Sequence, residues 1–143
     1  MRVAIIEDRI EQELHIAAPP EVIFSFFTDP AKHPRWMGRR AALDARPGGI
    51  YRCEVNDTHT VIGEFILVEP PNRVVFTWGF AGNDAVPPGS STVSITLTAT
   101  PDGTQLHLIH TGLPHPALGD HEEGWEGYLA QLAAAVEPYR LRS

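Results

Sequence analysis

The chain has 143 residues, of which 43% are hydrophobic and 20% are charged, and its formal net charge at pH 7 is −7. A single domain is expected, because domains usually run to about 100–200 residues and a chain of this size can hold a core without disulfides. The acidic balance disfavours nucleic acids and anionic membrane surfaces as partners, since both are negatively charged.

The first part of the chain predicts one strand and two short helices. Residues 8–16 alternate between apolar and polar side chains, which is typical of a half-buried antiparallel strand. Pro19-Pro20-Glu21 then begins a helix, because proline suits the first helical turn and the carboxylate complements the helix dipole. Asp29-Pro30 ends it, since proline disfavours helical geometry in the preceding residue. A second short helix is expected over residues 31–36.

The middle of the chain predicts about six further strands. They include residues 50–55, 59–69, 73–80, 92–100 and 104–111, which are separated by turns rich in Pro, Gly, Asn and Asp. Gly63 lies inside one of these strands and predicts a bulge or a sharp bend, as a strongly curved sheet requires.

A long final helix is expected over residues 121–140, with Asp120 as its N-cap. Its apolar residues lie at helical spacing: Trp125, Tyr128, Leu129, Leu132, Val136 and Tyr139. Consecutive strands with short turns pair antiparallel, and this helix is the only long element available to cover the sheet. The fold class is therefore α+β, with a curved antiparallel sheet of about seven strands around a long C-terminal helix and two short helices after the first strand.

An ordered set of motifs resembles a known family. In chain order the motifs are Ala17-Ala18-Pro19-Pro20-Glu21-Val22-Ile23, Thr28-Asp29-Pro30, Trp36, Arg46-Pro47-Gly48-Gly49-Ile50-Tyr51, Gly63-Glu64-Phe65, Glu69-Pro70-Pro71-Asn72-Arg73-Val74-Val75-Phe76-Thr77-Trp78, Thr111-Gly112-Leu113 and His121-Glu122-Glu123-Gly124-Trp125. Over residues 9–141 the chain is similar to the activator of heat-shock-protein-90 ATPase homologue-like proteins, within the START-like (SRPBCC, polyketide cyclase/dehydrase) superfamily.

The resemblance implies a single helix-grip domain over residues 1–143, with a cavity between the sheet and the last helix. Members of the superfamily bind lipids, hormones or polyketides, and some catalyse cyclisation or dehydration. Chaperone activation is not expected, because the founding eukaryotic activator uses a separate N-terminal region for which 143 residues leave no room.

Alternation and helical phase direct most of the pocket candidates inward. These candidates are Trp36, Tyr51, Trp78, Phe80, His110, Trp125 and Leu129. The alternative is that the aromatic residues are simply core, since buried aromatics dominate cores generally. A concave sheet that faces one helix is difficult to fill completely, which favours a pocket of apolar walls with a few polar groups.

His110 shares its strand face with Leu106 and Leu108, so it is expected to point into the concave side. A neutral imidazole there can orient a ligand or act as a general base. The alternative is a structural histidine bonded to a backbone carbonyl or to Tyr51. His121 is expected either to hydrogen-bond at the pocket mouth or to have a structural role at the helix start.

No metal or other cofactor is expected. His107 and His110 are three residues apart on a strand and face opposite ways, and no H-E-x-x-H, phosphate-loop, dinucleotide or Gly-x-Ser-x-Gly pattern occurs. Cys53, the single cysteine, is expected to be a buried small apolar residue, and it allows no intramolecular disulfide. The early acidic residues exclude a signal peptide and no apolar run is long enough to span a bilayer, so a cytoplasmic protein without membrane insertion is expected.

The leading functional prediction is a protein that binds a small apolar or aromatic molecule. One alternative is a polyketide cyclase/dehydratase-like enzyme that uses His110 as general base. A second ionisable group near His110 would favour this alternative. Glu64 is not a good candidate for that group, because alternation places it on the opposite strand face from Phe65. The other is a stress-response co-chaperone-like interaction module, which an exposed apolar patch would favour. A homodimer is left open by the sequence.

Overall fold

The computed structural model describes residues 2–6 and 8–140. Its strands are β1 (Arg2–Ile6), β2 (Arg9–Ile16), β3 (Arg40–Leu43), β4 (Ile50–Glu54), β5 (Thr60–Glu69), β6 (Arg73–Trp78), β7 (Ser91–Thr100) and β8 (Gly103–Thr111). Its helices are α1 (Pro20–Thr28) and α2 (Leu118–Ala135), with short 3₁₀ helices η1 (His33–Arg35), η2 (His115–Ala117) and η3 (Glu137–Tyr139).

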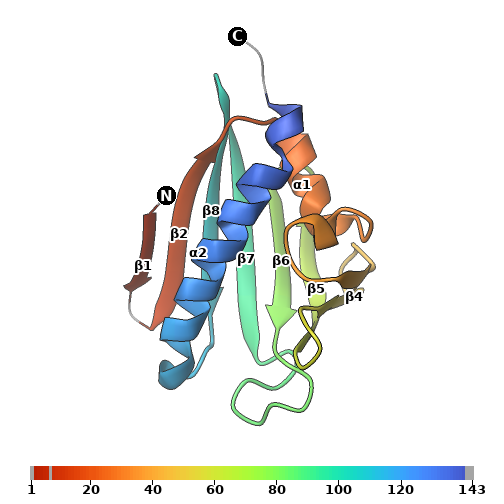
Figure 1. The fold of residues 1–143 in the computed structure, drawn as a ribbon, viewed down its shortest axis with the longest axis vertical. Helices are drawn as coiled ribbons and strands as arrows, with labels where there is room; N and C mark the ends of the chain where they lie inside the picture. The colour runs from red at the N-terminus through yellow and green to blue at the C-terminus, as the bar shows by residue number, and fades with distance from the viewer. Residues whose placement is uncertain (1, 7, 141–143) are drawn as a thin grey trace.

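The eight strands form one sheet in the order β1-β2-β8-β7-β6-β5-β4-β3, and every neighbouring pair is antiparallel. Helix α2 crosses one face of the sheet diagonally, and α1 lies beside its C-terminal end (Figure 1). The predicted helix-grip fold, with a curved sheet around a long C-terminal helix, is therefore confirmed.

The two strands absent from the sequence prediction lie at the two edges of the sheet. β1 pairs only with β2, from Arg2 opposite Glu13 to Ile6 opposite Arg9, and β3 pairs only with β4. β3 has four residues, and none of them is fully buried. Because an edge strand of this kind buries little apolar surface, it carries a weak alternation signal.

Helix α2 begins at Leu118, three residues earlier than predicted, and ends at Ala135. Asp120 therefore lies within the first turn, and Ala117 takes the N-cap position that the sequence assigned to Asp120. Pro138 lies in the short helix η3, since a proline does not continue an α-helix. Tyr139 is 40% exposed and does not join the predicted apolar stripe, whose buried members are Trp125, Leu129, Leu132 and Val136. Across residues 2–6 and 8–140, no helix combines the length and the apolar character needed to cross a bilayer.

The Trp36 side chain connects the segment after α1 to that helix. α1 begins at Pro20 as predicted, and its Phe26 and Phe27 are fully buried. The Trp36 indole N–H donates to the Phe26 carbonyl at 2.8 Å, and the Phe27 and Trp36 rings meet edge to face. The second predicted helix, over residues 31–36, is the three-residue turn η1.

Gly63 allows β5 to approach β6 closely. A Cβ at Gly63 would overlap the Thr77 carbonyl, and the Glu64 N–H donates to the Thr77 hydroxyl at 2.9 Å. The bulge itself lies further on, where the β5–β6 register shifts between Phe65 and Leu67. Gly63 is therefore a site of close backbone approach, and of the two predicted features, a bulge or a sharp bend, the bulge does not lie at Gly63.

We expect Gly63→Ala to lower the free energy of unfolding by about 2 kcal/mol, because the added methyl has to displace backbone rather than a flexible side chain. Urea unfolding of the variant measures the loss. Gly82→Ala, in the β6–β7 loop, is the control for substitution of a glycine without a clash, since nothing lies within 4 Å of its Cβ position, although its positive φ of 71° adds some strain. If Gly63→Ala were no less stable than this control, the close approach would not constrain the fold.

Candidate functional site

Most of the hollow between sheet and helix is filled by side chains. Five of the seven predicted pocket residues are at most 2% exposed: Trp36, Tyr51, His110, Trp125 and Leu129. Tyr51 stacks on Phe76, with ring centroids 4.1 Å apart and an interplanar angle of 13°, and Phe65 meets both rings edge to face. For these five residues the alternative of core packing describes their surroundings.

His110 is held on both sides by hydrogen bonds. The Trp125 indole N–H donates to His110 Nδ1 at 2.9 Å, so Nδ1 is the unprotonated nitrogen. Nε2 then carries the proton and lies 2.9 Å from the Ser91 hydroxyl, which itself donates to the Trp78 carbonyl at 2.8 Å. This chain of four groups satisfies both ring nitrogens and fixes the neutral tautomer.

The surroundings of His110 do not suit a general base. Burial, together with a smaller effect of the neighbouring His121, lowers the pKa of His110 to about 3. The side chain has no exposed surface, and its one proton-accepting nitrogen already receives the indole N–H. The prediction that His110 faces the concave side is confirmed. Its expected structural partners were Tyr51 or a carbonyl, whereas the partners in the structure are Trp125 and Ser91.

Tyr51 is bonded to a histidine that the sequence prediction did not single out. The Tyr51 hydroxyl lies 2.7 Å from Nε2 of His33, and both residues are fully buried. Burial lowers the pKa of His33 to about 4 and raises the pKa of the Tyr51 phenol well above its usual range. His33 lies in the short turn η1, where neither a period of 2 nor one of 3.6 applies, so no pattern marked it as buried.

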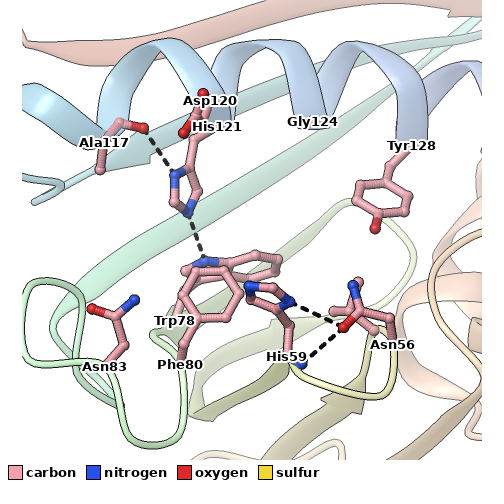
Figure 2. Close-up of a pocket in the computed structure, with 11 residues that line it drawn as sticks. Asn56, His59, Trp78, Phe80, Asn83, Ala117, Asp120, His121, Gly124 and Tyr128 are labelled. Atoms are coloured by element: carbon pink, nitrogen blue, oxygen red, sulfur yellow. Dashed lines mark hydrogen bonds between the residues drawn. The ribbon is translucent and has the colours of Figure 1, made fainter.

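A cavity of about 390 Å³ opens at one end of the hollow, between the N-terminal half of α2 and the sheet. Its lining residues come from the β4–β5 loop, the end of β6 and the loop after it, and α2 with the residue before it: Val55, Asn56, His59, Trp78, Phe80, Asn83, Ala117, Asp120, His121, Gly124 and Tyr128. Figure 2 shows α2 above and the aromatic rings below. Of the predicted pocket residues, Trp78 and Phe80 belong to this lining.

Trp78 and Phe80 form the aromatic base of the cavity, and His121 joins them to α2. The Trp78 and Phe80 rings meet edge to face at 5.9 Å. The Trp78 indole N–H donates to His121 Nε2 at 3.3 Å, while His121 Nδ1 lies 2.9 Å from the Ala117 carbonyl and donates to it. Burial lowers the pKa of His121, so the imidazole is neutral. His121 thus lines the cavity and also bonds the residue that precedes α2, which combines the two roles expected of it.

Two asparagines shape the loops that bring polar groups to the cavity. The Asn56 side-chain carbonyl accepts the backbone N–H groups of Thr58 and His59, each at 2.9 Å. The Asn83 carbonyl accepts those of Ala85 and Val86 in the same way. The sequence marked both regions as turns, because Asn forms such local bonds readily, but it gave no sign that the two turns meet.

Gly124 leaves the helix wall of the cavity open. It lies on α2 between His121 and Tyr128, and a Cβ added there would meet no heavy atom within 4 Å. Glycine in a helix costs about 1 kcal/mol relative to alanine. At this position the missing side chain leaves space inside the lining.

In the part of the chain that the structure describes, no three His, Cys, Asp or Glu side chains lie close enough together to hold a metal ion. Cys53 is buried as predicted, and burial raises the pKa of its thiol to about 12. His107 faces away from His110, as predicted, with its Nε2 3.9 Å from carboxylate oxygens of Glu11 and Glu13.

Comparison with known proteins places this geometry among related folds. Residues 17–137 match the family described as Activator of Hsp90 ATPase homolog 1-like protein. The AHSA1-like protein RHE_CH02687 from Rhizobium etli is 38% identical, with a TM-score of 0.73 over 100% of this chain and 95% of that chain. Protein MLL2253 from Mesorhizobium loti is 25% identical, with a TM-score of 0.83 over 93% of this chain and 99% of that chain.

A curated relative in yeast is much longer than this chain. Uncharacterized protein C1711.08 from Schizosaccharomyces pombe is 26% identical over 114 residues, which are 79% of this chain and 31% of the relative. The chain therefore spans only part of that protein.

Proposed function

The chain belongs to the Activator of Hsp90 ATPase homolog 1-like family, and on this premise we propose that it binds a small apolar or aromatic molecule in the cavity beside α2. The observation that carries the proposal is the cavity of about 390 Å³ with the Trp78 and Phe80 rings at its base. Small-molecule sites are typically concave, mostly apolar, about 300–1,000 Å³ in volume and edged by a few polar groups.

The buried residues behind the cavity support it rather than contact the ligand. The Trp78 indole is fixed by His121, and the Trp78 carbonyl accepts the Ser91 hydroxyl that also bonds His110. An indole that is bonded through its N–H to His121, on a backbone that Ser91 also bonds, presents a fixed apolar face, which reduces the ordering cost of binding. In this proposal, the five buried residues that the sequence predicted as ligand contacts support the cavity from behind instead. They are Trp36, Tyr51, His110, Trp125 and Leu129.

The two alternative functions receive less support. The cyclase/dehydratase alternative depends on His110 as general base, and that residue is buried with both nitrogens bonded. For the interaction module, the large apolar side chains exposed among the described residues are Ile5, Ile50, Ile66 and Tyr139, which lie on β1, on β4 and β5, and after α2. They are distributed over separate regions instead of forming one patch. A homodimer and a cytoplasmic location stay predictions.

Filling the cavity is expected to abolish binding without unfolding the chain. In Gly124→Leu, the new side chain enters the cavity where a Cβ has free space. We expect the affinity for the apolar fluorophore N-phenyl-1-naphthylamine to fall at least about tenfold, because its binding volume is occupied. Fluorescence titration measures the affinity, and thermal unfolding checks that the variant is folded.

Gly119→Leu is the matched control, because it makes the same substitution on α2 at an exposed position outside the lining, also with free space for a Cβ. It should bind the fluorophore as the unsubstituted chain does. Equal binding by all three proteins would refute the proposed site. Native mass spectrometry of the protein from its own host gives a second test, since a co-purifying molecule should be retained by Gly119→Leu and lost by Gly124→Leu.

A further inference from the structure

We infer that the ligand is an uncharged or cationic aromatic molecule with an O–H or N–H donor, of the phenol or arylamine class, and that the cavity selects against carboxylates. The inference rests on the proposed function and deepens it. It follows from the hydrogen-bonding state of His59 and from the charges that line the cavity.

His59 presents a hydrogen-bond acceptor to the cavity. The Asn56 side chain is oriented with its oxygen toward His59, because that oxygen already accepts the backbone N–H groups of Thr58 and His59. His59 Nδ1 lies 3.0 Å from the same oxygen and 2.9 Å from the Thr58 hydroxyl. Nδ1 must therefore carry the proton, since an unprotonated nitrogen would face an oxygen lone pair.

With the proton on Nδ1, His59 Nε2 holds a lone pair. No side chain or backbone group in the described part of the chain bonds this nitrogen, while the ring meets Phe80 edge to face at 6.0 Å. Figure 2 shows the nitrogen on the Phe80 side of the imidazole, away from Asn56. An aromatic ligand that packs against Phe80 brings its own substituents next to this acceptor. An O–H or N–H on that ligand satisfies Nε2, whereas an ether or a carboxylate does not.

The charges around the cavity favour ligands that are not anions. The eleven lining residues contain no lysine or arginine, and their one carboxylate is Asp120. The imidazole of His121 is neutral, because its Nε2 accepts the Trp78 indole N–H and its Nδ1 donates to the Ala117 carbonyl. A carboxylate that enters this cavity loses water without gaining a positive partner, which is costly. The chain's net charge of −7 adds repulsion of the same sign.

The remaining rim groups are neutral and do not reverse this selection. The Asn56 and Asn83 carbonyls are used by their own turns, which leaves their NH₂ groups as donors. Burial raises the pKa of the Tyr128 phenol, so this group stays a neutral hydroxyl. These donors suit a ketone or ether oxygen elsewhere on the ligand, but none supplies the full positive charge that a carboxylate needs.

Three naphthalene probes of one size test the inference: 2-naphthol, 2-methoxynaphthalene and 2-naphthoate. Near pH 7 the naphthol is an uncharged donor, the methyl ether lacks the donor and the naphthoate is an anion. His59 is exposed in the free protein, so the expected gain is the net value of one hydrogen bond, about 1 kcal/mol. Isothermal titration calorimetry on the full chain should therefore give about tenfold tighter binding of 2-naphthol than of 2-methoxynaphthalene. Binding of 2-naphthoate should be weaker still.

Two variants assign the selection to residues. His59→Phe keeps a ring against Phe80 but removes the acceptor, so it should reduce 2-naphthol binding to the level of the ether and leave the ether unchanged. Asp120→Asn should strengthen 2-naphthoate binding several-fold with little effect on the ether. The matched controls are His115→Phe and Glu126→Gln, which change an exposed histidine and an exposed α2 carboxylate outside the lining and should alter neither ratio.

The outcomes separate this inference from the proposed function. Equal binding of the three probes, or a preference for naphthoate, would overturn the ligand class while the proposed cavity stood. A naphthol preference that survived in His59→Phe would overturn the role of His59. If Gly124→Leu retained full affinity for the naphthol and for N-phenyl-1-naphthylamine, the proposed site itself would be wrong.

Discussion

Acidification from about pH 7 to about pH 4 is expected to remove about 6 kcal/mol of stability through two buried histidines, His33 and His110. Burial lowers the pKa of His33 to about 4 and that of His110 to about 3, against 6.5 in the absence of the fold. One pKa unit corresponds to about 1.4 kcal/mol, so each histidine contributes about 3 kcal/mol over this range. Domains of ordinary stability have about 5–15 kcal/mol in total. Acidification to pH 4 should therefore remove a large part of the free energy of unfolding.

The direction follows from which state binds protons. Each folded-state pKa lies below the unfolded value, so between about pH 6.5 and pH 4 the unfolded chain is protonated at these sites and the folded chain is not. The stabilising contribution is complete above about pH 6.5 and is lost as the pH falls. Protonation of His110 would also place a second donor against the Trp125 indole N–H, whose acceptor among residues 2–6 and 8–140 is His110 Nδ1.

His110→Gln tests the assignment. A glutamine can accept the indole N–H and donate to Ser91, but it does not titrate, so the variant should lose about 3 kcal/mol less than the unsubstituted chain between pH 7 and pH 4. Urea unfolding at a series of pH values measures this slope. His115→Gln, at an exposed histidine that pairs with Asp8, is the control and should keep the full slope. An unchanged slope in His110→Gln would show that His110 is not the acid-sensitive group.

The periodic parts of the sequence predicted the fold because each strand has one buried face. In β7 the alternation predicts that Val93, Ile95, Leu97 and Ala99 face inward; the first three are at most 1% exposed, whereas Ala99, next to the last residue of the strand, is exposed. The N-terminal start of α2 was placed three residues late, because Asp120 suits an N-cap by its chemistry, while the chain enters the helix directly from the turn η2. The N-cap preference of Asp therefore identified the region in which the helix starts but not the residue at which it starts.

The site was predicted only where it lies on regular structure. Trp78, which ends β6, and Phe80, two residues beyond it, were placed in the cavity lining by alternation. Asn56, His59 and Asn83 lie in loops, and no period relates them to one another or to α2. Their convergence depends on the bend of the sheet, which is a tertiary property and is not written in any one segment.

The structure also shows why the cavity lies at one end of the hollow. Trp125 projects from the middle of α2 and reaches His110 on β8, so these two side chains occupy the space that a ligand would need there. One helical turn before Trp125 the helix carries His121, and between them lies Gly124, which has no side chain to fill the gap. The size of residues on successive turns of one helix thus decides where the hollow is packed and where it is open.

Trp125→Phe is expected to lower the free energy of unfolding by about 2–3 kcal/mol. The change removes the indole N–H that bonds His110 Nδ1 and leaves that nitrogen buried without a donor, which costs about 1–3 kcal/mol. The smaller ring adds a packing loss because Trp125 is 2% exposed. Urea unfolding near pH 7 measures the sum of the two terms.

A double-mutant cycle with His110→Leu separates the hydrogen bond from the packing. In the double variant neither partner leaves an unpaired group, since the Ser91 hydroxyl still donates to the Trp78 carbonyl. The double variant should therefore lose about 1–3 kcal/mol less than the sum of the two single variants. Trp36→Phe with His110→Leu is the matched control, because the Trp36 indole donates to the Phe26 carbonyl outside this network, so those losses should add. If the losses in free energy of unfolding were additive in both cycles, the Trp125 indole and the His110 imidazole would be neighbours without an energetic coupling. The tautomer of His110 would then have to be set by Ser91 alone.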